Sequence, residues 1–253
     1  MNNNEEFEKA REYLEAGLSA LGHRGSAPDR VRDPAYADIL MELMCLVLER
    51  NEYINLTTIT EPEEFAALHL IDSLACVGLP EFDSAIRVID VGSGAGFPGL
   101  PLAALYPEKK FLLTDSLRKR VDFIGFAASS LGLSNVETLH ARAETAGQDS
   151  SLREGFDLAL CRAVGKLSVA MEYCLPFVQV AGAGFFYKTI QAQGEIEDSL
   201  LARKLLGGAE EVRVETYPDI LPTRRHALYI IHKERHTPKK YPRREGIPSK
   251  VPL

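Results

Sequence analysis

Cysteine is scarce in this chain of 253 residues, and none of its cysteines forms a Cys-x-x-Cys pair. The sequence therefore predicts neither a metal cluster nor a disulfide framework. We expect reduced thiols in a cytoplasmic protein that binds no metal. The four cysteines are Cys45, Cys76, Cys161 and Cys174.

Long apolar runs are missing as well. No apolar stretch reaches about 18 residues, which is the length that a membrane-spanning helix needs. The N-terminal segment also lacks the charged, apolar and small-residue layout of a signal peptide. We therefore expect no membrane association, and we find no internal repeat that would indicate a solenoid.

Charge is unevenly placed along the chain. Residues 1–84 hold 6 Lys and Arg against 17 Asp and Glu, a net of −11. Residues 233–253 hold 7 basic residues against 2 acidic ones, a net of +5. A basic end on a protein whose overall net charge is −7 favours contact with nucleic acid phosphates.

The spacing of apolar residues changes near residue 85. Before it, the apolar residues recur at helical spacing, and after it short β-rich runs alternate with helical segments, which predicts an α/β fold with a mostly parallel sheet. The last two runs have no helix between them and predict one antiparallel edge strand. We divide the chain into an N-terminal helical extension (1–84), an α/β domain (85–232) and a basic C-terminal arm (233–253). The expected strands are 88–91, 111–115, 135–140, 156–161, 184–188, 212–217 and 227–232, and a helix is expected over 167–180.

A glycine-rich stretch follows the first expected strand. Glycine lets the backbone turn sharply and lets a ligand approach without a Cβ in the way. The helix that follows offers free N–H groups to an anionic part of the ligand. The glycines that occupy alternate positions after the strand are Gly92, Gly94 and Gly96.

Two nucleotide-binding patterns compete for this stretch. Gly94-x-Gly96-x-x-Gly99 matches the dinucleotide fingerprint and favours NAD. However, Gly92 already stands where that fingerprint should begin, and Phe97 stands where its third glycine would then fall. Asp90 gives instead Asp-x-Gly-x-Gly-x-Gly, which is typical of class I S-adenosylmethionine-dependent methyltransferases. No Gly-Lys-Ser/Thr follows, so a P-loop is excluded.

Asp115 ends the second expected strand. The carboxyl edge of a parallel sheet is where ligands bind, and a carboxylate there can accept both ribose hydroxyls. The alternative is that Asp115 only caps the following helix.

Several motifs in series resemble the ribosomal RNA small subunit methyltransferase G family, once called glucose-inhibited division protein B. The resemblance covers nearly the whole chain from about residue 35. Besides the glycine stretch, the motifs are Asn55-Leu-Thr-Thr, His69-Leu-Ile-Asp-Ser73, Asp115-Ser-Leu-x-Lys-Arg120, Arg142-Ala-Glu144, Arg162-Ala-Val and Thr237-Pro-Lys-Lys-Tyr-Pro-Arg-Arg-x-Gly-x-Pro.

The resemblance implies a Rossmann-like class I methyltransferase with a seven-stranded sheet. It would use S-adenosylmethionine to methylate N7 of one guanosine in 16S ribosomal RNA of the 30S subunit, near the decoding region, and we expect a monomer. Arg162 would act at the reactive end of the cofactor as the catalytic residue. The residues implied at the cofactor are Asp90, Gly92, Gly94, Gly96, Phe97, Asp115, Ser116, Leu117, Ala143, Glu144 and Arg162.

The basic residues near these motifs are candidates for RNA contact. Residues 233–253 contain four prolines and are predicted to form an extended arm along RNA, with Tyr241 able to stack on a base. Deleting residues 236–253 is then expected to weaken RNA binding and leave cofactor affinity near normal. A solvated surface is the alternative. The candidates are Arg118, Lys119, Arg120, Lys188, Arg225, Lys239, Lys240, Arg243 and Arg244.

Guanine N7 carries a lone pair and no proton, so its methylation needs alignment rather than a general base. We accordingly expect no catalytic His–carboxylate dyad, and we interpret His69 and Asp72 as a structural pair. The alternative functions are an NAD-dependent oxidoreductase, a non-catalytic ribosome-assembly factor with a nucleotide fold, and methylation of a small molecule.

Overall fold

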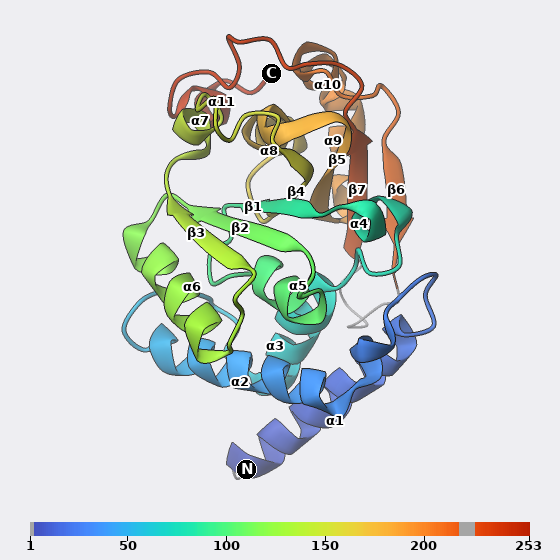
Figure 1. Ribbon diagram of the computed structural model, residues 1–253, viewed down its shortest axis with the longest axis vertical. Coiled ribbons are helices and arrows are strands. Elements are labelled where there is room, and N and C mark those ends of the chain that lie inside the picture. Colours follow the sequence, from blue (N-terminus) through green and yellow to red (C-terminus); the bar gives the residue numbers. More distant parts are fainter. Residues whose placement is uncertain (1–2, 218–225) are drawn as a thin grey trace.

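One seven-stranded sheet runs through the middle of the molecule (Figure 1). The computed structural model describes residues 3–217 and 226–253. The strand order is β3-β2-β1-β4-β5-β7-β6. The strands are β1 (Arg87–Val91), β2 (Lys110–Asp115), β3 (Val136–His140), β4 (Phe156–Arg162), β5 (Val178–Thr189), β6 (Arg213–Thr216) and β7 (His226–His232).

Strands β1 to β5 pair in parallel, and β7 pairs antiparallel with both β5 and β6. This confirms the mostly parallel sheet with its antiparallel pairing confined to one edge. The chain reverses there because only residues 217–225 separate β6 from β7, and parallel neighbours need a crossover of about a dozen residues or more.

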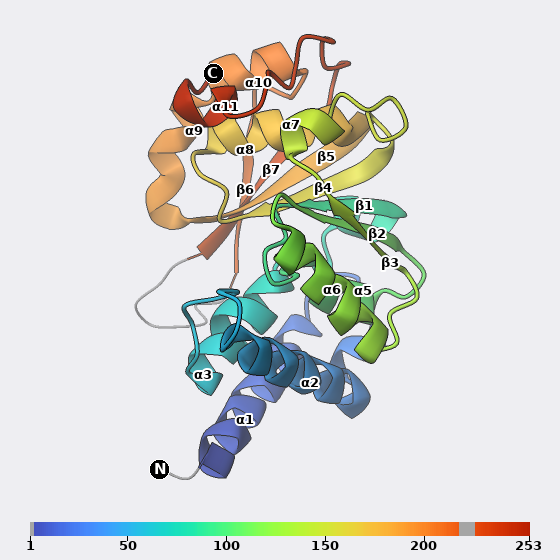
Figure 2. The same cartoon turned by 90° about the vertical axis from the view of Figure 1, so that its left-hand side faces the viewer.

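Helices cover both faces of the sheet (Figures 1 and 2). Consecutive strand residues point to opposite faces, so Leu158 and Leu160 enter one apolar core while Ala159 and Cys161 enter the other. The lower layer in Figure 1 contains α1 (Asn3–Leu21), α2 (Pro34–Asn51), α3 (Pro62–Phe65), α5 (Gly99–Leu105) and α6 (Arg118–Ser130). The upper layer contains α7 (Ala143–Ala146), α8 (Leu167–Cys174), α9 (Gly194–Asp198), α10 (Leu200–Leu206) and α11 (Ile247–Lys250).

The N-terminal helices share their apolar core with the sheet. Leu14 and Leu40 belong to the same buried cluster as Val88 and Leu113. The buried Tyr36 hydroxyl donates a hydrogen bond to the carbonyl of Pro101 in α5, at 2.9 Å. The helix α2 therefore directly supports the helix that follows the glycine stretch.

One predicted boundary is wrong. The helix expected over residues 167–180 ends at Cys174, a short 3₁₀ turn covers Leu175–Phe177, and β5 begins at Val178. Pro176 lacks an N–H and cannot continue an α-helix. The early part of β5 contains a bulge opposite β4, which hides its strand pattern in the sequence.

Within residues 3–217 and 226–253, no helix is both long and apolar enough to cross a membrane. The same residues contain no group of three or more His, Cys, Asp and Glu side chains that could hold a metal ion.

Candidate active site

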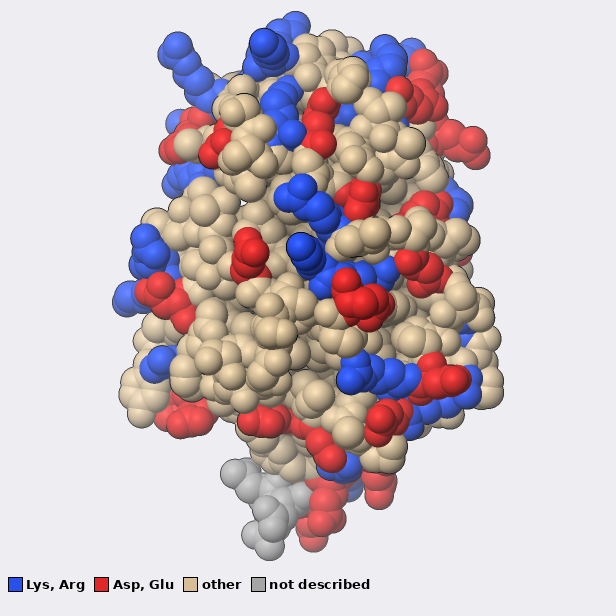
Figure 3. Space-filling view, viewed as in Figure 1, with Lys and Arg blue, Asp and Glu red and all other residues tan. Residues whose placement is uncertain are grey.

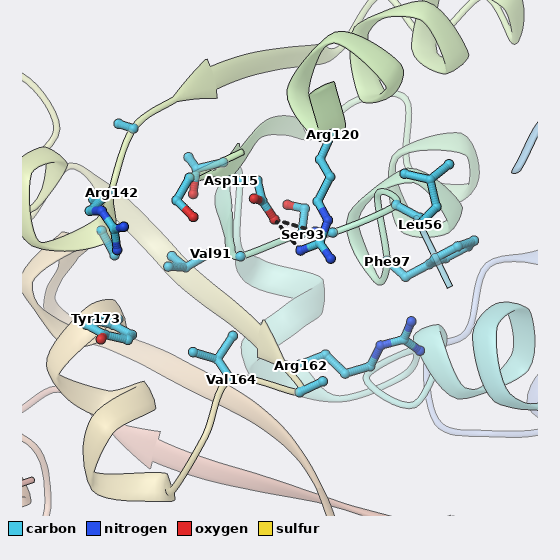
Figure 4. Close-up of a pocket in the computed structure, with 18 of the residues that line it drawn as sticks. Leu56, Val91, Ser93, Phe97, Asp115, Arg120, Arg142, Arg162, Val164 and Tyr173 are labelled. Atoms are coloured by element: carbon cyan, nitrogen blue, oxygen red, sulfur yellow. Dashed lines mark hydrogen bonds and ion pairs between the residues drawn. The ribbon is translucent and has the colours of Figure 1, made fainter. Parts of the chain in front are cut away.

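A cavity of about 410 Å³ opens at the carboxyl ends of β1, β2 and β4 (Figure 4). The chain leaves β1 towards β2 on one side, while β4 pairs on the other side. In open α/β sheets, ligands bind at this point where the strand order reverses. The residues implied at the cofactor that line the cavity are Gly92, Gly94, Phe97, Asp115, Ser116, Ala143, Glu144 and Arg162.

The glycine turn forms one wall of this cavity. Gly94 has a φ of +61°, and a Cβ at this position would meet nothing within 4 Å because it would point into open space. Gly96 has a φ of +93°, but its missing side chain faces Leu100 and not the cavity. Gly96 therefore gives the turn its shape and lies outside the cavity wall, and its contact with the ligand stays a prediction.

Asp90 lies behind the turn and not on the cavity wall. Its carboxylate is fully buried and accepts a hydrogen bond from the N–H of Gly99, at 2.9 Å. Burial raises the pKa of Asp90 to about 7, although the Gly99 N–H opposes this shift. Asp90 thus fixes the turn to the start of α5, and its contact with the ligand stays a prediction.

Asp115 joins the turn to the start of α6. One carboxylate oxygen accepts from the N–H of Gly94 at 3.1 Å, and the other accepts from the N–H of Leu117 at 2.8 Å. Asp115 therefore supports the helix start and also lines the cavity, so the two readings of this residue are compatible. The side chain of Leu117 is exposed and lies outside the cavity wall.

Arg162 at the end of β4 is held by the N-terminal third of the chain. It donates to the carbonyl of Leu68 at 2.9 Å and to the carboxylate of Asp72 at 3.2 Å. Its guanidinium also lies 5.4 Å from the ring centroid of Phe97. Its acceptors lie in and just after the π-helical turn η2 (Ala66–Ile71), which brings this segment against the cavity.

His69 in η2 is neutral. Burial, followed by the charge of Arg162, lowers its pKa to about 3. Its Nδ1 lies 2.9 Å from an Arg162 nitrogen and must accept, so its proton is on Nε2, which lies 2.7 Å from the hydroxyl of Thr57. The ring stacks on Phe97 at a centroid distance of 4.8 Å.

Asp72 accepts hydrogen bonds from residues in distant parts of the chain. Besides Arg162, its carboxylate accepts from the Tyr217 hydroxyl at 2.5 Å and from His226 Nδ1 at 2.7 Å. Burial opposes ionisation, but the His226 hydrogen bond and the Arg162 charge outweigh it and hold the pKa of Asp72 below its ordinary value. Arg162 thus bridges His69 and Asp72.

The opposite end of the cavity is formed by Ala143, Glu144 and Tyr173. Figure 4 shows Arg142 and Tyr173 at this end, with Leu56, Phe97 and Arg162 at the other. Leu56, His69 and Arg142 belong to motifs that the sequence presents, although no ligand role was assigned to them. Tyr173 has no sequence signal, because it lies within the apolar pattern of α8.

The predicted RNA contacts fall into separate groups. Arg120 lines the cavity, whereas Arg118 and Lys119 are exposed beside it. The ammonium of Lys188 is bound to Glu195 at 2.9 Å and to the carbonyl of Gly165, so it is not free for phosphate. Arg225 lies outside the described residues.

The C-terminal segment also departs from the prediction. Lys239, Lys240 and Arg244 are exposed, but Arg243 is paired with the fully buried Glu172 at 2.6 Å. The Tyr241 ring is only 5 % exposed and packs in the upper core. The expectation that Tyr241 stacks on a base is therefore wrong, because its ring already fills an apolar site.

Comparisons with known proteins agree with this architecture. The ribosomal RNA small subunit methyltransferase G of Alkaliphilus metalliredigens is 46% identical over 211 residues, which cover 82% of this chain and 87% of that protein. The protein of that name from Bacillus cytotoxicus is 42% identical over 240 residues, covering 95% and 98%. The solved structure of cofactor-bound Rv0187 from MTB shares the fold, with a TM-score of 0.51 at 16% identity over 82% of this chain and 99% of that one. The sequence model of the rRNA small subunit methyltransferase G family matches residues 37–219, and the chain therefore belongs to that family.

Proposed function

We propose that this chain transfers the methyl group of S-adenosylmethionine to N7 of a guanosine in 16S ribosomal RNA. The observation that carries the proposal is the cavity of about 410 Å³ at the carboxyl ends of β1, β2 and β4, in a chain of this family. A volume of this size is in the range of small-molecule and cofactor sites.

The residues around the cavity fit the cofactor. The open space in front of Gly94 leaves room for the methionine part of the cofactor. Asp115 provides carboxylate oxygens for the ribose hydroxyls, and Ala143 and Glu144 lie where the adenine would rest. The oxidoreductase alternative has no such support, since the family model and the relatives are methyltransferases.

The reaction requires the protein mainly to align the methyl donor with the acceptor atom. The cofactor supplies a methyl group on a sulfonium, which is a good leaving group. Guanine N7 attacks with its lone pair and loses no proton, so the protein must hold acceptor and donor in line. His69 is consistent with this, because both of its ring nitrogens are bound, to Arg162 and Thr57, and neither is free to remove a proton.

We further propose that the protein acts in the cytoplasm as a monomer. The exposed cations Lys239, Lys240 and Arg244 would contact RNA phosphates, whereas Arg120 at the cavity is paired with Asp115 at 3.5 Å. The net charge of +5 over residues 233–253 supports these contacts with RNA phosphates.

The test is incubation with S-adenosylmethionine labelled in its methyl group and with bulk RNA, either free or in 30S subunits, followed by nucleoside analysis. Label in 7-methylguanosine of 16S RNA is expected, and the two forms of RNA identify the substrate. Label on another atom, or none in either form, contradicts the proposal. Calorimetry with S-adenosylmethionine against NAD checks the cofactor separately.

A further inference from the structure

The C-terminal strap (residues 237–249) crosses the outer side of α7 and α8 (Figures 1 and 2). It carries an excess of positive charge, yet several of its polar groups point inwards. Its backbone carbonyls, three backbone N–H groups and one guanidinium are bound to residues 142–173. These residues include the wall of the cavity opposite the glycine turn.

The strongest of these contacts joins Arg243 to Glu172 in α8. The carboxylate of Glu172 is fully buried and accepts from the Arg243 backbone N–H at 2.8 Å and from two guanidinium nitrogens at 2.9 and 2.6 Å. Removing one partner of a buried ion pair leaves the other charge uncompensated. Arg243 therefore anchors the strap on the residue that precedes Tyr173.

The strap is also fitted to α7. The side chain of Gln148 donates to the carbonyls of Lys239 and Pro242, at 3.1 and 2.8 Å. Gly147 packs so closely on Pro242 that an added Cβ would lie 2.9 Å from the proline ring. The Thr145 hydroxyl donates to Glu245 at 2.6 Å.

These contacts reach two of the cavity-lining side chains of this wall. The backbone N–H of Gly246 donates to Glu144 at 2.9 Å. The Tyr173 hydroxyl lies beside both Glu144 and Ser249 of the strap. Glu144 is 5 % exposed, so its rotamer depends on the groups of the strap that contact it on the side away from the cavity.

We propose that the strap is a positioning element of the cofactor site, which holds Glu144 and Tyr173 in place for the adenosine part of S-adenosylmethionine. This inference rests on the proposed function, which places the adenine against this wall. It replaces the expectation that deleting residues 236–253 leaves cofactor affinity near normal. The exposed cations of the same strap remain available for RNA.

The experiment measures the Kd of the full chain by calorimetry for S-adenosylhomocysteine and for 5′-methylthioadenosine, which contains the adenosine part without the amino acid. Arg243→Ala is expected to weaken both ligands by the same factor, roughly tenfold, equivalent to about 1.4 kcal/mol. Arg243→Lys keeps the charge opposite Glu172 and should recover part of the loss. Arg244→Ala removes an exposed neighbouring cation and should change neither Kd.

Far-UV circular dichroism and thermal unfolding show whether the variants remain folded. If Arg243→Ala does not fold, Gln148→Ala is tested instead, because the exposed Gln148 side chain donates hydrogen bonds only to carbonyls of the strap. The affinity for both ligands is then expected to fall two- to threefold. Unchanged affinities in a folded variant overturn the proposal, and so does weakening of S-adenosylhomocysteine alone. A wild-type chain that binds neither ligand would instead overturn the proposed function.

Discussion

Arg162 connects the end of β4 to η2 through a planar group that fits three acceptors. A lysine has a single nitrogen on a flexible stem and cannot satisfy the Leu68 carbonyl, His69 and Asp72 together. Side chains that line the cavity therefore depend on the identity of this residue and not only on its charge.

We predict that Arg162→Lys lowers kcat/KM for methyl transfer by roughly 10- to 100-fold, since losing one hydrogen bond of a charged group costs about 1.5–3 kcal/mol. Steady-state kinetics with labelled S-adenosylmethionine measures it. Arg30→Lys, at an exposed position outside the cavity, is the matched control and should retain activity. A lower melting temperature with unchanged kcat/KM would show that Arg162 has only a structural role.

Asp90 makes stability depend on pH. Its folded pKa is raised to about 7, above its ordinary value of 3.8. The native state therefore retains a proton that the unfolded chain has lost, and this contribution to stability is full below about pH 4 and is lost as the pH rises through 7.

We predict that Asp90→Asn, which keeps an acceptor for the Gly99 N–H and cannot ionise, removes this dependence. Urea unfolding at pH 5 and pH 8 should show a smaller difference for the variant than for the wild type, by roughly 1–3 kcal/mol. Equal differences in the two proteins would mean that Asp90 ionises as freely in the folded state as in the unfolded one.

At the scale of elements, the turn between β1 and α5 combines two requirements that can be separated. Gly94 needs a positive φ, and it also needs empty space on the cavity side. Gly132, which follows α6, has a similar φ of +67° and also has nothing within 4 Å of its missing Cβ, but it does not line the cavity.

We predict that Gly94→Ala and Gly132→Ala destabilise the fold by similar amounts, about 1–2 kcal/mol, because both place an alanine in the left-handed region. Only Gly94→Ala should weaken S-adenosylmethionine binding, because its methyl group enters the cavity. Calorimetry and thermal unfolding of the two variants measure both effects. Equal cofactor affinities for the two would contradict the proposed position of the methionine part.

The turn, Asp115 and most strands could be predicted from sequence because each signal is contained in a few consecutive residues. The end of α8 could not, since the bulged start of β5 has no regular alternation. The support around the cavity was also hidden. Gly246 is hydrogen-bonded to Glu144, which lies 102 positions away in the sequence, and His226 is hydrogen-bonded to Asp72, which lies 154 positions away. A single sequence gives no sign of contacts between residues so far apart.

At the scale of the whole molecule, the two ends of the chain carry net charges of opposite sign. Figure 3 shows frequent red side chains at the bottom, over the N-terminal helices, and blue side chains among red ones at the top, where the C-terminal segment lies. This agrees with the net charges of −11 over residues 1–84 and +5 over residues 233–253. An RNA approaching the cavity would be repelled by the N-terminal helices and attracted by the strap.

We predict that replacing Lys239, Lys240 and Arg244 together by alanine weakens RNA binding and lowers the slope of log affinity against log salt by about 2–3. Cofactor Kd should not change, since these side chains point outwards. Filter binding over a series of salt concentrations measures the slope. A slope equal to that of the wild type would exclude these cations from the RNA interface.

The order of the wall and the strap along the chain also has a consequence for biosynthesis. Translation proceeds from the N-terminus, so Glu144 and Tyr173 leave the ribosome well before Arg243 and Gly246. Until the strap follows, the nascent chain has the sheet, but its adenosine wall lacks the contacts that hold it. If the strap positions this wall, the enzyme gains full affinity for its cofactor only once residues 237–249 have left the ribosome.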